Sequence, residues 1–463
     1  MPGLTGGAHG TDTPGWGVGG LPVWRAWLPW WAAAAAILAL GWLGRHIWTW
    51  PLAAAGLGLG LRLWRRNRGS GTNLLGRAAT FPWENVRLTP QERLRHVHCV
   101  GPSGSGKTTS VLAPLLAQDL ASGAGVAVLE IKGGDLGRLV RATAARLGRP
   151  VAEWAPAGGG DVVWNPLAHP SPACAERLIF ALQRVGGTSS AGAEYYQAVG
   201  AGVLRHAVGA FASAGAALDL MRLRSFLVDP RARQQVLRDV RDPLVREYFL
   251  TVFEAWRPDE RLRNLQGILN HLDALLAAPE VRASLCPDGT LPTLDLDATL
   301  AEGRILLGTL PLGSMLRLAQ GLGSFLLAAL QAAAYARPAP TPPCFLYLDE
   351  FQHFAGPGFA DFLALCRGFG VGAVLAHQNL AQLRAAGGPA LEETVLANAR
   401  TSVILRCDAP DAAAFAARLP QSPGRPWSAA MLAELPFGQG VVVRRGNRSR
   451  PRARTVRLRP WMA

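Results

Sequence analysis

The sequence contains almost no lysine. Of its 47 basic residues only Lys107 and Lys132 are lysines, and the others are arginines. An arginine guanidinium is a rigid planar fork, whereas a lysine ammonium is a compact charge on a flexible stem. A composition so biased toward arginine indicates that the two positions that keep lysine need an ammonium, which makes them candidates for specific chemistry.

The spacings of common metal and disulfide sites are also missing. None of the six cysteines stands in a C-x-x-C pair, and the nine histidines show no H-E-x-x-H spacing. These absences argue against a zinc site or a disulfide framework. Several cysteines lie in apolar, strand-like runs, so we interpret them as buried thiols in a reducing compartment.

Acidic residues are scarce beside the basic ones, 32 against 47, which gives a formal net charge of +15. That excess suits a polyanionic partner or an anionic membrane surface, and equally a solvated basic surface, so composition does not choose among them. A length of 463 residues is typical of two to three domains.

The N-terminal part has the composition of a membrane anchor. Residues 1–22 are rich in Gly and Thr, and we expect them to be disordered. Two apolar stretches, at about 27–43 and 47–61, are flanked by tryptophans and followed by four arginines between positions 62 and 68. This pattern predicts a transmembrane hairpin and basic linker over residues 23–70, with both chain termini in the cytoplasm. The alternative is a single amphipathic interfacial element.

A Gly-rich loop follows a strand-like run at 96–100. It matches G-x-x-x-x-G-K-[ST] at every fixed position and consists of Gly101, Pro102, Ser103, Gly104, Ser105, Gly106, Lys107 and Thr108. In such a loop, backbone N–H groups and a helix N-terminus hold phosphates, the lysine reaches the β- and γ-phosphates, and the hydroxyl coordinates Mg²⁺. An apolar run at 111–116 supplies the helix. We therefore predict that this loop, with Thr109, binds Mg·ATP.

A second apolar run, at 344–348, ends in Asp349 and Glu350. It is typical of a buried parallel strand, whose carboxyl end lies where open α/β sheets bind ligands. We expect Asp349 to bind Mg²⁺ and Glu350 to act as the general base for the attacking water. The alternative is a solvated acidic turn.

Two further strand-like runs end in polar residues. The run at 371–376 precedes His377 and Gln378, and the Gln378 amide can sense the γ-phosphate, unless it serves as a helix cap. The run at 125–129 precedes Glu130 and Lys132. The Lys132 ammonium can reach nucleotide, carboxylates linked to Mg²⁺ or cargo, unless the segment is an ordinary surface turn.

With these features the chain resembles the coupling-protein ATPases of type IV secretion and conjugation, the TraG/TraD family. The resemblance covers most of residues 25–460. It rests on the N-terminal hairpin and on four segments: Glu-Ile-Lys-Gly-Gly-Asp-Leu at 130–136, Trp-Asn-Pro-Leu at 164–167, Leu-Asp-Glu-Phe at 348–351 and Ala-His-Gln at 376–378. The family usually has Asp-Pro in place of Glu130 and Ile131, and Thr in place of His377.

The resemblance implies a RecA-like α/β domain around a mostly parallel sheet, assigned to residues 71–168 and 301–463. It also implies an all-α insertion at 169–300, where the sequence itself shows mainly helical periodicity. It implies a homo-hexameric ring with a channel for single-stranded DNA, in which Arg367 acts as an arginine finger on the neighbouring subunit's nucleotide. The basic segment 444–454 either contacts nucleic acid or anionic lipid, or is a plain hairpin turn.

These features lead to one expected function. The chain would be a multi-pass protein of the bacterial inner membrane, with its ATPase domain in the cytoplasm. It would couple ATP hydrolysis to the transfer of DNA, or of a relaxase–DNA complex, through the proteins of a type IV secretion channel. The alternatives are an FtsK/HerA-like pump on double-stranded DNA, and a substrate-recruiting receptor that uses nucleotide as a switch.

Overall fold

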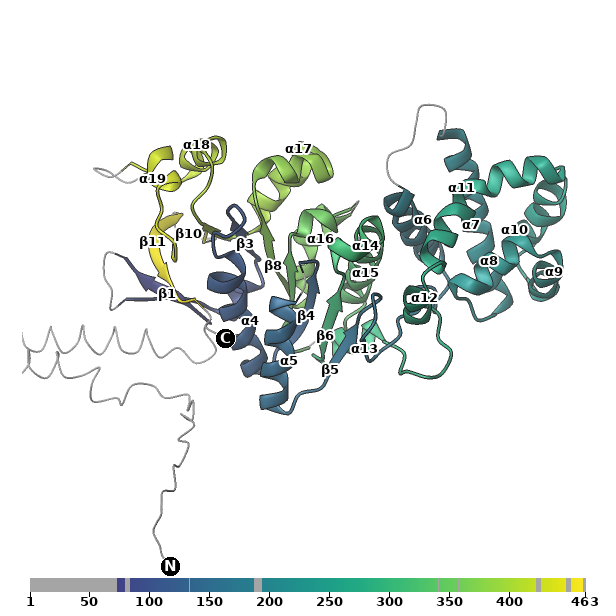
Figure 1. Ribbon diagram of the computed structural model, residues 1–463, viewed down its shortest axis with the longest axis horizontal. Coiled ribbons are helices and arrows are strands. Elements are labelled where there is room, and N and C mark those ends of the chain that lie inside the picture. The colour runs from purple at the N-terminus through teal and green to yellow at the C-terminus, as the bar shows by residue number, and fades with distance from the viewer. Residues whose placement is uncertain are drawn as a thin grey trace, which may run out of the picture. The chain divides into compact units, whose positions relative to one another are not determined.

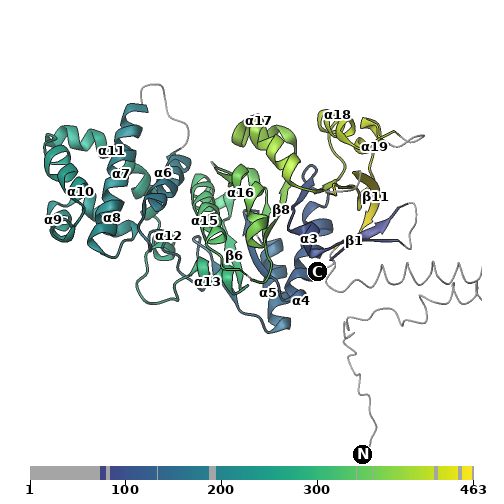
Figure 2. The same cartoon turned by 180° about the vertical axis from the view of Figure 1, so that it is seen from behind.

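The computed structural model describes residues 73–79, 84–132, 134–186, 194–339, 341–356, 358–421, 426–446 and 451–460. The segment 1–22, expected to be disordered, and the transmembrane hairpin expected at 23–70 lie outside these residues. Residues 71–463 form one compact unit, which Figures 1 and 2 show from opposite sides.

A single sheet organises the described residues, in the order β2-β1-β11-β10-β9-β3-β8-β7-β4-β6-β5. The seven strands from β9 to β5 are parallel, and β10, β11, β1 and β2 continue the sheet in antiparallel fashion. The strands are β1 (Asn73–Ala78), β2 (Asn85–Leu88), β3 (Val97–Val100), β4 (Gly125–Glu130), β5 (Val151–Trp154), β6 (Ile305–Thr309), β7 (Cys344–Asp349), β8 (Val371–His377), β9 (Thr401–Ile404), β10 (Gln439–Arg444) and β11 (Arg452–Leu458).

The central strands are apolar because both of their faces are covered by helices. Every residue of β3, β4, β7 and β8 is buried, as expected for parallel strands between two helical layers. One apolar cluster joins Val128 and Tyr347 to helices that follow β3 and β4, and another joins Leu129 and Leu348 to helices on the opposite face. The helices around the sheet are α3 (Pro90–Arg93), η1 (Lys107–Leu112), α4 (Ala113–Ser122), α5 (Asp135–Leu147), α14 (Leu312–Met315), α15 (Arg317–Tyr335), η3 (Phe351–His353), α16 (Phe359–Leu365), η4 (Cys366–Phe369), α17 (Leu380–Asn398), α18 (Ala409–Arg418) and α19 (Ala429–Ala433).

Between β5 and β6 the described elements are helices: α6 (Pro172–Gly186), α7 (Glu194–Ala214), α8 (Leu220–Val228), α9 (Pro230–Asp239), α10 (Pro243–Glu247), η2 (Tyr248–Phe253), α11 (Pro258–Leu276), α12 (Pro279–Leu285) and α13 (Leu296–Ala301). An aromatic group of Phe226, Phe249 and Phe253 lies in their core. Helix α6 packs against α15 of the sheet layer. The Asn165 amide nitrogen donates to the carbonyl of Leu218, 2.8 Å away, so the Trp-Asn-Pro-Leu segment joins the sheet to the helices.

A buried ion pair ties α3, the short helix before β3, to α4 after the phosphate loop. The guanidinium of Arg93 pairs with Asp119 of α4, and both side chains are almost fully buried. The Tyr347 hydroxyl donates to the same carboxylate at 2.6 Å, and the guanidinium lies 4.1 Å from the Phe345 ring centroid. This network fixes α4, which continues η1 after the phosphate loop, against β7, which ends in the acidic pair.

Among the described residues, one helix is long and apolar enough to cross a membrane. It is α15, and 61% of its apolar window is buried inside the structure, so here it serves as a core helix against α6. The basic segment at 444–454 joins two paired strands, since Arg444 of β10 lies opposite Arg452 of β11.

Candidate active site

The phosphate loop connects β3 to η1. The strand expected at 96–100 begins one residue later, because His96 takes a positive φ of 63°. Gly104 and Gly106 also have positive φ angles, 74° and 92°, which a side chain would strain. The loop is partly exposed around Pro102, Ser103 and Ser105, and Thr109 is exposed at the start of η1. Backbone groups are thus presented at a helix N-terminus, where anions bind.

Lys107 lies within the loop rather than in solvent. Its side chain is almost fully buried, and its ammonium donates to the carbonyls of Gly101 at 2.6 Å and Pro102 at 3.1 Å. Burial lowers the pKa of Lys107, and the negative charge of Glu350 opposes that shift. The structure therefore holds the ammonium beside the backbone that is expected to bind phosphate.

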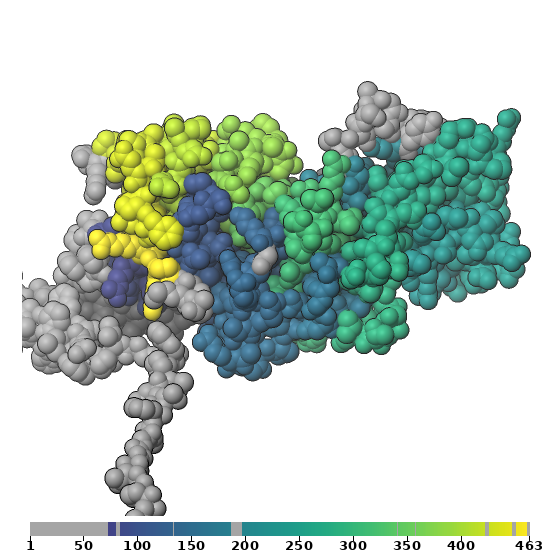
Figure 3. Space-filling view, viewed as in Figure 1, coloured from purple at the N-terminus to yellow at the C-terminus, as the bar shows by residue number. Residues whose placement is uncertain are grey.

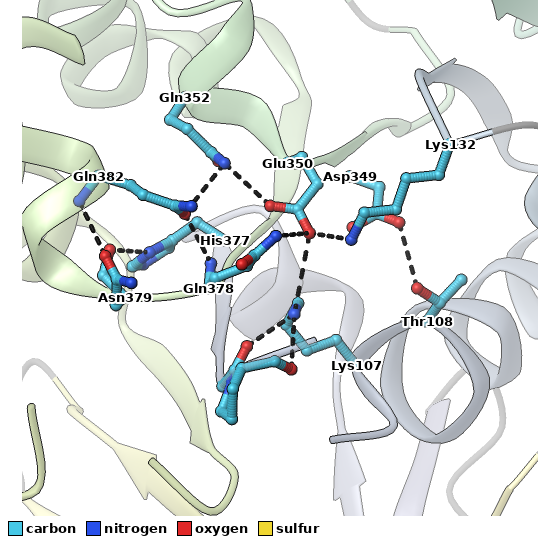
Figure 4. Close-up of polar contacts among 12 residues, drawn as sticks. Lys107, Thr108, Lys132, Asp349, Glu350, Gln352, His377, Gln378, Asn379 and Gln382 are labelled. Atoms are coloured by element: carbon cyan, nitrogen blue, oxygen red, sulfur yellow. Dashed lines mark hydrogen bonds and ion pairs between the residues drawn. The ribbon is translucent and has the colours of Figure 1, made fainter. Parts of the chain in front are cut away.

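Asp349 and Thr108 meet at the carboxyl end of β7. The Thr108 hydroxyl donates to Asp349 Oδ2 at 3.1 Å, as Figure 4 shows. Burial raises the pKa of Asp349, whereas the charge of Lys132 lowers it. The other carboxylate oxygen, Oδ1, is buried without a hydrogen-bond partner. A buried oxygen in need of a partner beside a hydroxyl fits a Mg²⁺ ion that takes most of its ligands from water and phosphate.

Glu350 receives several donors and two cations. Its Oε1 pairs with Lys132, accepts from the Gln378 amide at 3.2 Å and lies 3.9 Å from the Lys107 ammonium, while Oε2 accepts from Gln352 at 2.9 Å. Burial raises the pKa of Glu350, but the hydrogen bonds from Lys132 and Gln352 and the charges of the two lysines lower it more. The carboxylate is therefore held ionised.

The order of strands explains why these side chains meet. Strand β8 lies between β3 and β7, and Val100 of β3 is level with His377 of β8. Gln378 follows β8 directly, so it stands between the phosphate loop and the acidic pair. Glu350 adopts a left-handed φ of 53°, an uncommon conformation that turns the chain away from the strand.

A histidine pair supports the end of β8. His377 Nδ1 lies 2.9 Å from the carbonyl of Asn379, and its Nε2 lies 2.6 Å from Nε2 of His98 on β3. Burial lowers the pKa of His377 to about 4, so the ring is neutral at physiological pH. His377, which stands where the TraG/TraD family usually has threonine, thus contacts the neighbouring strand β3. These contacts hold the backbone in place immediately before Gln378.

The turn after β4 keeps a defined geometry although it departs from the family's Asp-Pro. Both carboxylate oxygens of Glu130 accept backbone N–H bonds, from Leu136 at 3.1 Å and Gly137 at 3.0 Å. A buried carboxylate therefore holds the start of α5 and places the turn that carries Lys132. From the sequence, nucleotide, carboxylates linked to Mg²⁺ and cargo were all open as partners of Lys132; in the structure it pairs with Glu350, the residue next to Asp349.

Arg367 lies apart from this group. It belongs to η4, which precedes the amino end of β8, and its side chain is exposed. The phosphate loop and the acidic pair lie at the carboxyl ends of the parallel strands. Within one chain, Arg367 therefore lies at the other end of these strands, beyond their amino ends. Two further site residues, Gln352 and Gln382, belong to no motif recognised in the sequence; the Gln352 amide nitrogen donates to Gln382 Oε1 at 3.1 Å, beside Glu350.

Comparisons with known proteins found a matching family model and several similar solved structures. Residues 343–419 match a family model described as the TraM recognition site of TraD and TraG. Two similar structures are the plasmid coupling protein TrwB with the non-hydrolysable GTP analogue GDPNP (19% identity, TM-score 0.62, covering 86% of this chain and 92% of that one) and TrwB with ADP and Mg²⁺ (19%, 0.63, 87% and 93%). A third is VirB4 of Thermoanaerobacter pseudethanolicus (16%, 0.56, 85% and 98%). A comparison with curated proteins found no match.

At these identities the likeness to solved structures concerns the fold. It confirms a mostly parallel α/β sheet with a helical region, matching the RecA-like fold of TrwB. The matched family model covers β7, β8 and β9, and so includes the acidic pair and Gln378. The similarity to the TraG/TraD family of type IV coupling proteins thus rests on the family match over residues 343–419, together with a fold shared with TrwB.

Proposed function

We propose that this chain is an ATPase motor that couples ATP hydrolysis to the transfer of DNA, or of a relaxase–DNA complex, through a type IV secretion or conjugation apparatus. The observation that carries the proposal is the convergence of Lys107, Thr108, Asp349, Glu350 and Gln378 at the carboxyl ends of three adjacent strands. TrwB has been solved with nucleotide analogues and with ADP and Mg²⁺, which supports nucleotide as the ligand here.

Each residue has a role in hydrolysis. Residues 101–109 and the Lys107 ammonium bind the phosphates, and Thr108 with Asp349 would hold Mg²⁺, which supplies charge stabilisation at the phosphoryl oxygens when bound. Glu350 accepts a proton from water as the water oxygen bonds to the γ-phosphorus and the bond to the ADP oxygen breaks. Gln378, which already donates to Glu350, orients that water.

Glu350 must lose a donor before it can act. Its Oε1 is taken by Lys132, Gln378 and the nearby Lys107, and a carboxylate so engaged does not readily accept a hydrogen bond from water. Bound phosphate would attract both lysines away from it. Lys132 is free to move because its side chain is 42% exposed and glycine follows it in the turn.

Oligomerisation would complete the site. Arg367 is exposed and lies at the amino ends of the parallel strands, whereas the phosphate loop of its own chain lies at their carboxyl ends. We therefore propose that Arg367 acts on the nucleotide of a neighbouring subunit in a homo-hexamer. Residues 23–70 would anchor the ring in the bacterial inner membrane, with the ATPase domain in the cytoplasm.

The nature of the cargo is testable with the full chain. We expect single-stranded DNA to stimulate ATP hydrolysis, and the stimulation to fall steeply as salt rises, because contacts to phosphates release counterions. Stronger stimulation by double-stranded DNA would favour an FtsK/HerA-like pump. Hydrolysis that no DNA affects at any salt concentration would refute the DNA motor and favour the receptor.

A further inference from the structure

An exposed aromatic side chain lies against the phosphate loop, on the side away from Glu350. Phe437 is 71% exposed, the highest value for an aromatic side chain among the described residues. A Cβ placed on Gly106 would lie 3.3 Å from Cε2 and 3.5 Å from Cζ of its ring. The ring edge therefore touches the last glycine before Lys107. No described element covers most of the ring, so its exposure needs a reason.

The topology of the sheet explains how this residue reaches the loop. Phe437 lies just before β10, which runs antiparallel to β9, so β10 begins at the edge where the parallel strands end. Strand β9 in turn adjoins β3, which leads into the phosphate loop. Figure 3 shows the C-terminal segment in yellow bordering the dark blue segment that contains the loop.

The loop therefore has two different sides. Strands β8 and β7 flank one side and bring Gln378, Glu350 and Asp349, which address the terminal phosphate. Strands β9 and β10 flank the other, where Leu405 packs against Gly101 and Phe437 against Gly106. A triphosphate that lies along the loop with its γ end toward Glu350 must direct its nucleoside toward β9 and β10.

We propose that the Phe437 ring is the stacking platform for the nucleobase of the nucleotide bound at the phosphate loop. The proposal rests on the proposed function, because it requires a nucleotide there. Every base has a π face, so stacking on a phenyl ring binds purine nucleotides without reading their hydrogen-bonding edges. Phe437 is thus a binding residue that does not touch the reacting phosphorus.

The test compares a ligand that carries a nucleobase with a polyphosphate that has none. Calorimetric titrations of the full chain with Mg·ADP and with magnesium tripolyphosphate would be run for wild type, Phe437→Ala and Phe437→Trp. We expect Phe437→Ala to weaken Mg·ADP binding by about 5- to 100-fold, the range found when a base-stacking aromatic is removed. Tripolyphosphate binding should not change, and Phe437→Trp should restore or tighten Mg·ADP binding. Leu244→Ala, which truncates a side chain 73% exposed in the helical region, is the matched control.

Three results would overturn the inference. Unchanged Mg·ADP affinity in Phe437→Ala would show that the base does not stack there. An equal loss for both ligands would mean that the ring supports the loop instead. Unchanged affinity with a loss of oligomer in sedimentation would make Phe437 a contact between subunits. The proposed function fails separately: in that case the wild type itself binds neither ligand.

Discussion

Replacing Lys132 by methionine should move the acid limb of ATP hydrolysis to higher pH. In the described structure Lys132 pairs with Glu350, and its charge lowers the pKa of both Glu350 and Asp349. Both carboxylates must be ionised, one to accept a proton and the other to hold Mg²⁺. Without Lys132, less positive charge counteracts the effect of burial, so the pKa values of both carboxylates rise. Protonation of the carboxylates then inactivates the enzyme at a higher pH.

The size of the shift follows from exposure and distance. An opposite charge close to a carboxylate lowers its pKa by about 1–3 units. The Lys132 side chain is 42% exposed whereas Glu350 is buried, so solvent screens the pair in part, and Lys107 remains 3.9 Å away. We therefore expect a shift near the lower end of that range, about 1 pH unit.

The assay is the pH dependence of kcat/KM, which reports ionisations of the free enzyme, the state in which Lys132 contacts Glu350. Lys132→Arg keeps the positive charge, so the acid limb of its pH profile should coincide with that of the wild type, although a guanidinium fits the position beside Glu350 less well than an ammonium. Arg141→Met removes a cation that pairs with Glu153 away from the site and serves as the control. An acid limb in Lys132→Met that coincides with the wild-type limb would refute the reasoning.

Three further predictions concern the base, the finger and the fold. Glu350→Gln should preserve Mg·ATP binding and slow turnover by about 10²–10⁴-fold, the usual effect of losing a general base; turnover within a few fold of wild type would rule Glu350 out as the base. Mixing inactive Arg367→Ala with inactive Lys107→Ala should restore partial activity if the finger acts across subunits, whereas mixtures that stay inactive would indicate a role within one chain. Asp119→Ala leaves the buried Arg93 guanidinium without its partner and should lower the free energy of unfolding by about 3–5 kcal/mol; an unchanged denaturation midpoint would contradict this.

Much of the sheet could be predicted because its strands are continuous apolar runs. The runs at 125–129, 344–348 and 371–376 correspond to β4, β7 and β8, with ends that differ by one residue. Strands β1 and β2 were not predicted, because their alternation of polar and apolar residues over few positions resembles a loop. The order of strands was also beyond sequence reasoning, since the position of β8 between β3 and β7 depends on contacts between distant residues.

The site was predictable where a motif has fixed spacing. Lys107, Thr108, Asp349 and Glu350 come from such motifs, and the structure brings them together. The contact between Lys132 and Glu350 joins residues 218 positions apart, and no local pattern encodes it. Phe437 stands alone in a short loop, so only its place beside Gly106 distinguishes it from an incidental surface aromatic.

The central claim is that Lys107 and the acidic pair act on one Mg·ATP. It is tested most directly by comparing Mg²⁺-dependent ATP hydrolysis by the wild-type chain with that by Lys107→Ala, prepared in parallel. We expect steady hydrolysis by the wild type and its loss in the variant, because the phosphates lose their ammonium. Equal turnover by the two proteins would contradict the account, since the hydrolysis would then occur somewhere other than at this loop.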